Sequence, residues 1–539
     1  MHLRSFAVTA ALTAFISVFS AQSPCAAQSF VDVAVEVDRL INEETQPSEI
    51  NRCDDETFVR RVYLDVVGQL PSLDDILVFG LEDHPDKRRF LLEFVLDDQD
   101  YGTNWANYWR DVITYRRTND QSQLGVLAFQ QYLAESLNEN KPWDEIARDL
   151  ITASGDIREN GETGLIAAQQ GRPEETVSEI SRIFMGIQIQ CAQCHDHPTD
   201  QWTRQQFHEL AAFFPRVAMR PQMDPRTFLV YAIDRTPRNR RQNNNNRFIG
   251  TLEHNMPNLE NPAEEGPVIT PKFFMNDKEV VIGTSDASRR STLADWVTDS
   301  NNQWFAKAVT NRMWSELVGE GFCEPVDDLG PDRDVTAPEA FDYLAGQFAA
   351  SGYDLKWLIA TIMSTESYQR ESRDRRNYDE VPFQANVPQP LRSDQLFDSL
   401  LNVFELEEKP PTSNAQGPNP FNLRNVPRFG FANVFGYDPN NLREEVSTSI
   451  PQALAMMNST FINQQLNAAP NSVLGKLLRE VPDNQQAVKE LYLRVLSRRP
   501  NRSELNTSLT YIRQVGDRSE AFADLIWALI NTTEFKTRK

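Results

Sequence analysis

The sequence predicts a mainly α-helical protein with two helical domains and a β-rich insertion between them. Two observations carry this prediction. Apolar residues recur at the spacing of a helix face over residues 51–215 and again over 289–539. Between these parts, residues 216–288 contain short β-like runs such as Phe228-Leu229-Val230-Tyr231, set among many Pro and Asn residues.

The N-terminus has the features of a secretory signal peptide over residues 1–27. Arg4 supplies a basic start, Phe6–Phe19 is an apolar stretch, and Cys25-Ala26-Ala27 has the small residues of a cleavage site. The apolar stretch is shorter than a bilayer requires, which disfavours a membrane anchor. We therefore expect an exported protein, periplasmic or extracellular, with no membrane span in the mature chain. A polar lead-in over residues 28–50 is expected to follow.

Helix-start signals divide the first helical domain. Ser72 precedes an apolar run with acidic residues in its first turn, and Thr203 with Gln206 forms a capping box. The clearest helix is predicted over Glu174–Gln190, where one face is lined by apolar residues. This helix is expected to run directly into Cys191.

The aromatic residues of the first domain are expected to lie in its core. Trp105 and Trp109 stand four residues apart, a spacing that places them on one helix face, and such a stripe is more often core than a cofactor site. Helices are expected to resume at about residue 289 and to continue to the C-terminus. A stretch at about 407–448 is rich in Pro, Asn and Gly and is predicted to be a long loop.

Charge and cysteine content limit the classes of function. The formal net charge is −23, and a strongly acidic chain repels nucleic acid, so we expect no nucleic-acid partner. Few cysteines remain once the signal peptide is removed, so disulfides are not expected to be the main stabilising element. Cys53 and Cys323 either pair with each other or are two separate buried thiols, and the second interpretation is favoured.

The most informative motif is Cys191-Ala192-Gln193-Cys194-His195. It has the C-x-x-C-H order of a c-type haem attachment sequence. Two thiols at this spacing form thioethers with the two vinyl groups of one haem, and the adjacent imidazole becomes an axial ligand of the iron. We therefore expect covalent haem c on Cys191, Cys194 and His195.

Two other interpretations of the same residues stay open. Cys191, Cys194 and a histidine, His195 or His197, could supply three ligands to zinc or a non-haem iron, with a fourth ligand from elsewhere in the chain. The two cysteines could also form a redox-active or structural disulfide. Haem is favoured over both because of the spacing of the motif and because the motif follows an export signal.

A haem held by His195 has a second axial position, and the sequence offers candidates for it. Met219 and Met223 follow the capped helix at a plausible separation, and His208, His254 and Met185 are further candidates. His197 lies too close to His195 in the chain to reach the opposite face of the same haem. It is expected to act, if at all, through a hydrogen bond or as a ligand of a non-haem metal.

These features lead to one favoured function and two alternatives. The favoured function is electron transfer or redox sensing, with a redox partner protein that the sequence does not identify. A haem or metal-dependent enzyme, for instance peroxidase-like, is the first alternative and requires an open axial position. The second is a structural or interaction protein whose Cys/His cluster binds a non-haem metal.

Taken in order, the segments of this chain resemble a family of exported planctomycete proteins, in which a PSCyt-type cytochrome-like domain precedes a PSD-type domain. Both domains are of unknown function. The resemblance implies an exported cytochrome-like protein and no established reaction. It rests on Phe58–Asp65, Tyr101-Gly102 with Trp105 and Trp109, Ser181–Phe214, Leu293–Trp296, Trp304–Ala306, Asn311-Arg312 with Trp314, Pro325–Asp328, Ser351–Leu355 and Pro451–Leu454 with Asn458.

Overall fold

A computed structural model shows the arrangement of the chain. It describes residues 28–47, 51–221, 227–233, 252–331, 333–373, 381–407, 427–440 and 449–539. The signal-peptide prediction for residues 1–27 lies outside these ranges.

Helices dominate the described residues, so the predicted mainly α class is confirmed. The first half contains α1 (Phe30–Thr45), α2 (Asp55–Val66), α3 (Leu73–Leu81), α4 (Lys87–Leu96), α5 (Asp100–Thr114), η1 (Gln121–Gly125), α6 (Val126–Asn138), α7 (Trp143–Thr152), η2 (Gly161–Thr163), α8 (Gly164–Ala168), α9 (Pro173–Met185), η3 (Gln190–Gln193) and α10 (Arg204–Ala211). The second half contains α11 (Asp286–Val297), α12 (Gln303–Val318), α13 (Pro338–Ala350), α14 (Leu355–Ser364), α15 (Glu366–Gln369), α16 (Ser393–Val403), α17 (Pro427–Phe435), α18 (Ile450–Asn458), α19 (Thr460–Gln465), α20 (Val473–Glu480), α21 (Asn484–Leu496), α22 (Arg502–Val515), α23 (Arg518–Ile530) and α24 (Thr533–Lys536).

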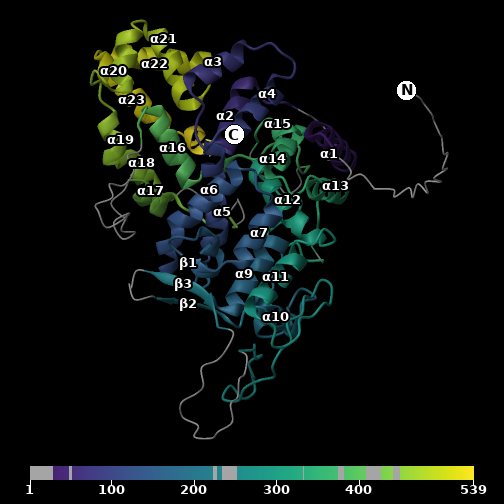
Figure 1. The fold of residues 1–539 in the computed structure, drawn as a ribbon. Helices are drawn as coiled ribbons and strands as arrows, with labels where there is room; N and C mark the ends of the chain where they lie inside the picture. Colours follow the sequence, from purple (N-terminus) through teal and green to yellow (C-terminus); the bar gives the residue numbers. More distant parts are fainter. Residues whose placement is uncertain are drawn as a thin grey trace, which may run out of the picture.

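The β structure of the described residues is small and falls into two separate sheets. Strands β1 (Gly155–Asp156), β3 (Phe228–Ala232) and β2 (Val217–Pro221) form an antiparallel sheet in that order (Figure 1). Strands β4 (Gln389–Pro390) and β5 (Thr537–Arg538) pair near the C-terminus. The predicted insertion therefore supplies two of the three strands in the first sheet.

Hydrophobic packing joins the two predicted helical domains. One cluster of buried residues runs from Val33 to Phe383, with Leu493 in addition, and it includes side chains from both sides of the insertion. A second cluster, which contains Leu396, Leu491 and Phe522, lies mainly in the group of helices from α16 to α24 (Figure 1), and Leu64 and Leu70 from the first half also belong to it. The main division in the packing therefore falls between residues 383 and 391, and the core is continuous across the insertion.

The stretch expected to be a polar lead-in forms helix α1. Val33, Val37 and Ile41 are fully buried on one face of it, and this face packs on α13 and α14 (Figure 1). The spacing of these three residues is that of a helix stripe, so the sequence contained the signal. A similar difference occurs later, where α17 forms within the stretch expected to be a loop.

Local helix signals were predicted well. Ser72 and Thr203 each accept a hydrogen bond from the backbone N–H three residues later, and both capping boxes form. Trp105 and Trp109 are buried, which confirms their assignment to the core. Cys53 and Cys323 are buried thiols that do not form a disulfide, in agreement with the favoured interpretation.

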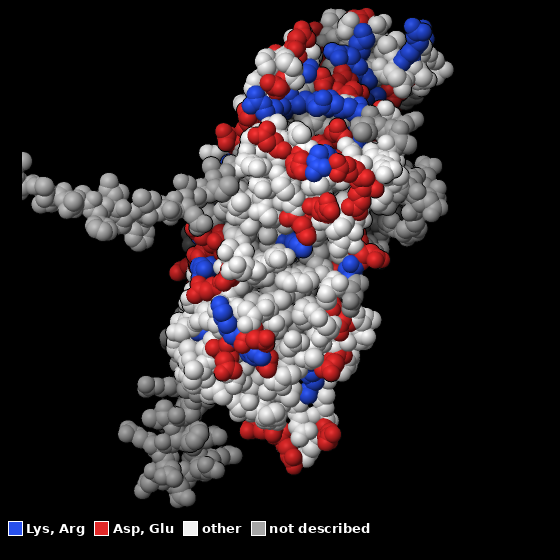
Figure 2. Space-filling model, turned by 90° about the vertical axis from the view of Figure 1, so that its right-hand side faces the viewer, with Lys and Arg blue, Asp and Glu red and all other residues white. Residues whose placement is uncertain are grey.

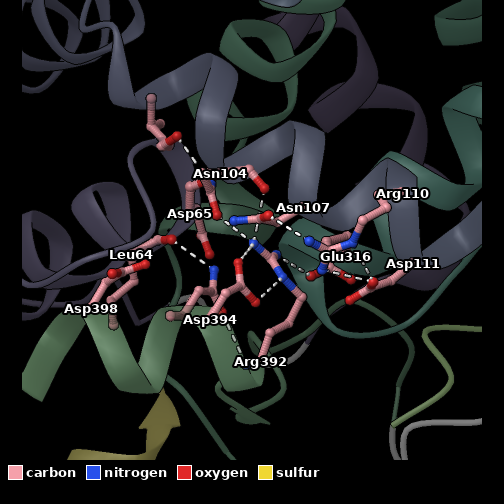
Figure 3. Close-up of polar contacts among 12 residues, drawn as sticks. Leu64, Asp65, Asn104, Asn107, Arg110, Asp111, Glu316, Arg392, Asp394 and Asp398 are labelled. Atoms are coloured by element: carbon pink, nitrogen blue, oxygen red, sulfur yellow. Dashed lines mark hydrogen bonds and ion pairs between the residues drawn. The ribbon is translucent and has the colours of Figure 1, made fainter. Parts of the chain in front are cut away.

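A buried ion cluster joins α5, α12 and the start of α16 (Figure 3). The Arg392 guanidinium pairs with Asp394 at 3.1 Å and with Glu316 at 3.5 Å, and it donates a hydrogen bond to Asn104. Burial alone would raise the pKa of Asp394, but the Arg392 charge outweighs it and holds the pKa below its usual value. The cluster fixes the start of α16 against α5 and α12.

On the face in Figure 2, acidic side chains occur along its length, and basic side chains are most frequent toward the upper end. Among the described residues, no helix combines the length and the apolar character needed to cross a bilayer.

Candidate functional site at the CxxCH loop

Helix α9 positions the loop that carries the motif. The helix ends at Met185, because Gly186 adopts a left-handed conformation with φ of 63° and closes the last turn. An added Cβ at Gly186 would lie 2.8 Å from Leu329 Cδ1, so the close packing there also requires glycine. The prediction that the helix runs directly into Cys191 was therefore wrong, since four residues separate its C-cap from Cys191.

The two cysteines lie on an exposed, tightly turned segment. Cys191 is part of η3, and Cys194 follows it directly. Both side chains are exposed, and neither takes part in a disulfide. Ala192 between them is fully buried and its N–H donates to Ile189 O at 2.9 Å. The loop therefore buries its middle and presents both thiols to solvent.

His195 is also exposed, and a hydrogen bond of its ring determines which ring nitrogen is available as a ligand. Nδ1 lies 2.7 Å from the backbone oxygen of Asp196. A carbonyl oxygen only accepts, so Nδ1 of the neutral ring carries the proton and Nε2 keeps its lone pair. In metal sites, a histidine ligand is oriented by this kind of hydrogen bond.

The remaining predicted ligands lie in different settings. His197 Nδ1 accepts a hydrogen bond from the Thr199 N–H at 3.4 Å, which places the proton of the neutral ring on Nε2. Met219 lies on β2 opposite Val230, and its half-buried side chain packs against the main hydrophobic cluster. Met223 lies outside the described residues.

A pair of buried histidines, His208 and His254, lies beneath the loop. The sequence suggested them only as further candidates for the second axial ligand. His208, on α10, is fully buried, and His254, from the insertion, is almost fully buried. His208 Nδ1 lies 2.9 Å from His254 Nε2, and His208 Nε2 lies 3.1 Å from the backbone oxygen of Gln193. Burial lowers the pKa of each histidine to about 4, and the neighbouring His254 adds to the effect at His208. Both rings are therefore neutral at pH 7.

A buried ion network lies at the base of the same loop. The Arg182 guanidinium, on α9, donates to Asp327 Oδ2 at 3.1 Å and to Asn440 Oδ1 at 2.7 Å. Gln188 donates to the other oxygen of Asp327 at 2.9 Å. The Asp327 side chain is fully buried. The sequence could not show this, because its partner Arg182 is 145 residues away.

A pocket of about 260 Å³ lies in the second half of the chain, next to Asp200 and Trp202, which follow the motif. It is lined mainly by apolar side chains, with Gly330 at the edge that meets Asp200. Trp304 in its wall makes an edge contact with Trp202, with ring centroids 6.5 Å apart. The apolar lining residues are Trp304, Leu329, Pro331, Val335, Pro338 and Phe341.

Two family models match this chain. Residues 35–219 match PSCyt2, a protein of unknown function, and residues 289–512 match PSD1, also a protein of unknown function. The chain carries a PSCyt2 segment followed by a PSD1 segment. No curated protein and no solved structure matches the sequence.

The order of the two segments agrees with the resemblance seen in the sequence. The CxxCH loop lies in the PSCyt2 segment, whereas Asp327 and the pocket lie in the PSD1 segment. His254 lies between the two matched ranges. The surroundings of the motif are therefore assembled from both segments and from the stretch that connects them.

Proposed function

We propose that this protein is an exported, cytochrome-like protein that carries a c-type haem on Cys191, Cys194 and His195, and that it functions in electron transfer or redox sensing. The observation that carries the proposal is the arrangement of His195. Its Nε2 is left free by the Nδ1 contact with Asp196, and it lies exposed directly after two exposed thiols. This is the donor set that haem attachment requires.

The chain's own residues would perform three tasks. Cys191 and Cys194 would bind the haem covalently, because both thiols are accessible and unpaired. His195 would supply one axial nitrogen, and the Asp196 carbonyl would hold its ring in the required tautomer. The haem would supply a one-electron couple at its iron.

The composition of the site supports haem over a zinc or non-haem iron centre. A structural zinc ion takes four protein ligands. Among the residues that the structure describes, no group of three His, Cys, Asp or Glu side chains is placed to hold a metal ion. Haem needs only one imidazole from the loop, because the porphyrin supplies four nitrogens.

Haem attachment is tested by producing the protein with a cytochrome c maturation system. We expect a band that stains for haem on a denaturing gel. The band should disappear completely in the Cys191→Ala plus Cys194→Ala variant, because both thioether bonds are lost. His195→Ala should keep the covalent haem but change its visible spectrum, since only the axial ligand is removed.

The matched control is Cys53→Ala plus Cys323→Ala, which removes two buried thiols that lie outside the motif. It should stain like the unchanged protein. A colourless protein that contains one equivalent of zinc would overturn the proposal.

The second axial position decides between a carrier and an enzyme. We predict a six-coordinate, low-spin haem with Met219 or Met223 as the second ligand, which makes electron transfer the main activity. The reduced protein should then bind carbon monoxide poorly, and a Met219→Ala plus Met223→Ala variant should become high-spin. Ready binding of carbon monoxide by the unchanged protein would favour the peroxidase-like alternative.

A further inference from the structure

We propose that His208 and His254 are positioning residues for the CxxCH loop, which they hold through the backbone carbonyl of Gln193. This inference deepens the proposed function, because the same loop would bind the haem. It assigns a task to the stretch between the PSCyt2 and PSD1 matches, since His254 comes from that stretch.

The proton positions follow from the contacts, one after another. The Gln193 oxygen only accepts, so His208 Nε2 carries a proton and donates to it at 3.1 Å. The neutral His208 ring then has a lone pair at Nδ1, so His254 Nε2 must donate across the 2.9 Å contact. His254 Nδ1 is left as an acceptor, 4.0 Å from a carboxylate oxygen of Glu174 at the start of α9.

This order makes the pair an anchor rather than a route for protons. The chain of hydrogen bonds ends on an amide carbonyl, which cannot pass a proton further. It fixes one atom of the loop, and that atom lies between Cys191 and Cys194 in sequence. Arg204 supports the same point, because its Nε donates to the Gln193 oxygen at 3.4 Å and its guanidinium also donates to Pro257 O at 2.6 Å.

His254 is itself held firmly. Its backbone oxygen accepts from the Ile269 N–H at 2.9 Å. The preceding residue, Glu253, pairs with two buried arginines, Arg216 at 2.8 Å and Arg289 at 2.5 Å. Arg289 belongs to α11, so the anchor reaches from the PSD1 segment through the connecting stretch to the motif.

The experiment measures hydrogen exchange at the Ala192 amide in the full-length, haem-free protein. This amide donates within the loop, so its exchange reports how well the loop is held. His208→Phe and His254→Phe keep a flat ring but remove the hydrogen bonds, and each should speed exchange at Ala192 about fivefold or more. His208→Gln keeps an N–H that reaches the Gln193 carbonyl, and its exchange should stay close to that of the unchanged protein.

Two comparisons separate positioning from general loss of stability. Amides in the middle of α12 should keep their exchange rates in all variants, and His84→Phe, at an exposed histidine, should change neither region. Unchanged exchange at Ala192 in both Phe variants would overturn the proposal. So would equal acceleration in His208→Gln, or acceleration that includes α12. If His208→Phe does not fold, His254→Phe and His208→Gln decide the question between them.

The haem-free sample keeps this test independent of the proposed function. If haem staining is negative while Ala192 exchange responds as expected, the haem proposal fails and the positioning pair stands. If staining is positive while exchange is unaffected, the pair does not position the loop.

Discussion

Replacing Arg182 with methionine is expected to lower the free energy of unfolding by about 3–5 kcal/mol. The Arg182 side chain is almost fully buried and contacts Glu179, Asp327 and Asn440, and it donates to the backbone oxygen of Val112 at 2.8 Å. Methionine fills a similar volume, but it removes one of the positive charges that pair with the buried Asp327 carboxylate. Urea denaturation, followed by circular dichroism, measures the change.

The acid dependence of stability gives a second measure of the same network. Burial alone would raise the pKa of Asp327, but Arg182 and Arg312 outweigh it and hold the pKa below its usual value of 3.8. A depressed carboxyl pKa stabilises the folded state above about pH 4, and this contribution is lost as the pH falls through the folded pKa. Arg182→Met should therefore weaken this part of the acid dependence.

Two variants make the Arg182 result specific. Adding Asp327→Asn to Arg182→Met removes the buried charge and should recover part of the lost stability. Arg479→Met removes an exposed arginine that pairs with Glu480, and it should cost less than about 1 kcal/mol. A cost below about 1 kcal/mol for Arg182→Met would show that the network does not hold the two segments together.

Trp109→Ala is expected to lower the free energy of unfolding by about 3–5 kcal/mol. Trp109 is fully buried, and its ring centroid lies 4.1 Å from that of Trp143 and 5.4 Å from that of Tyr108. The contacts continue from Trp143 to Phe184, on α9, and from there to Phe305, on α12. The aromatic chain thus connects the PSCyt2 and PSD1 segments through the helix that precedes the motif.

Trp109→Phe is the control, because within the described part of the chain the indole nitrogen of Trp109 makes no hydrogen bond that phenylalanine would lose. Among the described residues, Trp109 Nε1 has no hydrogen-bond partner, so Trp109→Phe loses volume but no hydrogen bond. It should cost clearly less than Trp109→Ala in the same urea experiment. Equal costs for the two variants would mean that a specific contact of the indole, and not the filled volume, is what stabilises the core.

Features near one another in the sequence could be predicted, and those made by distant residues could not. The motif order, the helix starts at Ser72 and Thr203 and the buried aromatic stripe depend on residues within a few positions of one another. Helix α1 was missed although Val33, Val37 and Ile41 show its stripe, because charged residues between them gave a polar average. The end of α9 was misplaced because the apolar pattern continues past Gly186, where only the left-handed backbone stops the helix.

The sequence by itself determined the helical class, the order of the PSCyt2 and PSD1 segments and the identity of the three residues proposed to bind haem. Tertiary structure alone decided what lies around them. His254 contacts His208 across 46 residues, and Arg182 meets Asp327 across 145. Local periodicity records only which face of an element is buried. Which distant side chains share that buried space is decided when helices from both segments pack together, because only then do buried polar groups acquire their partners.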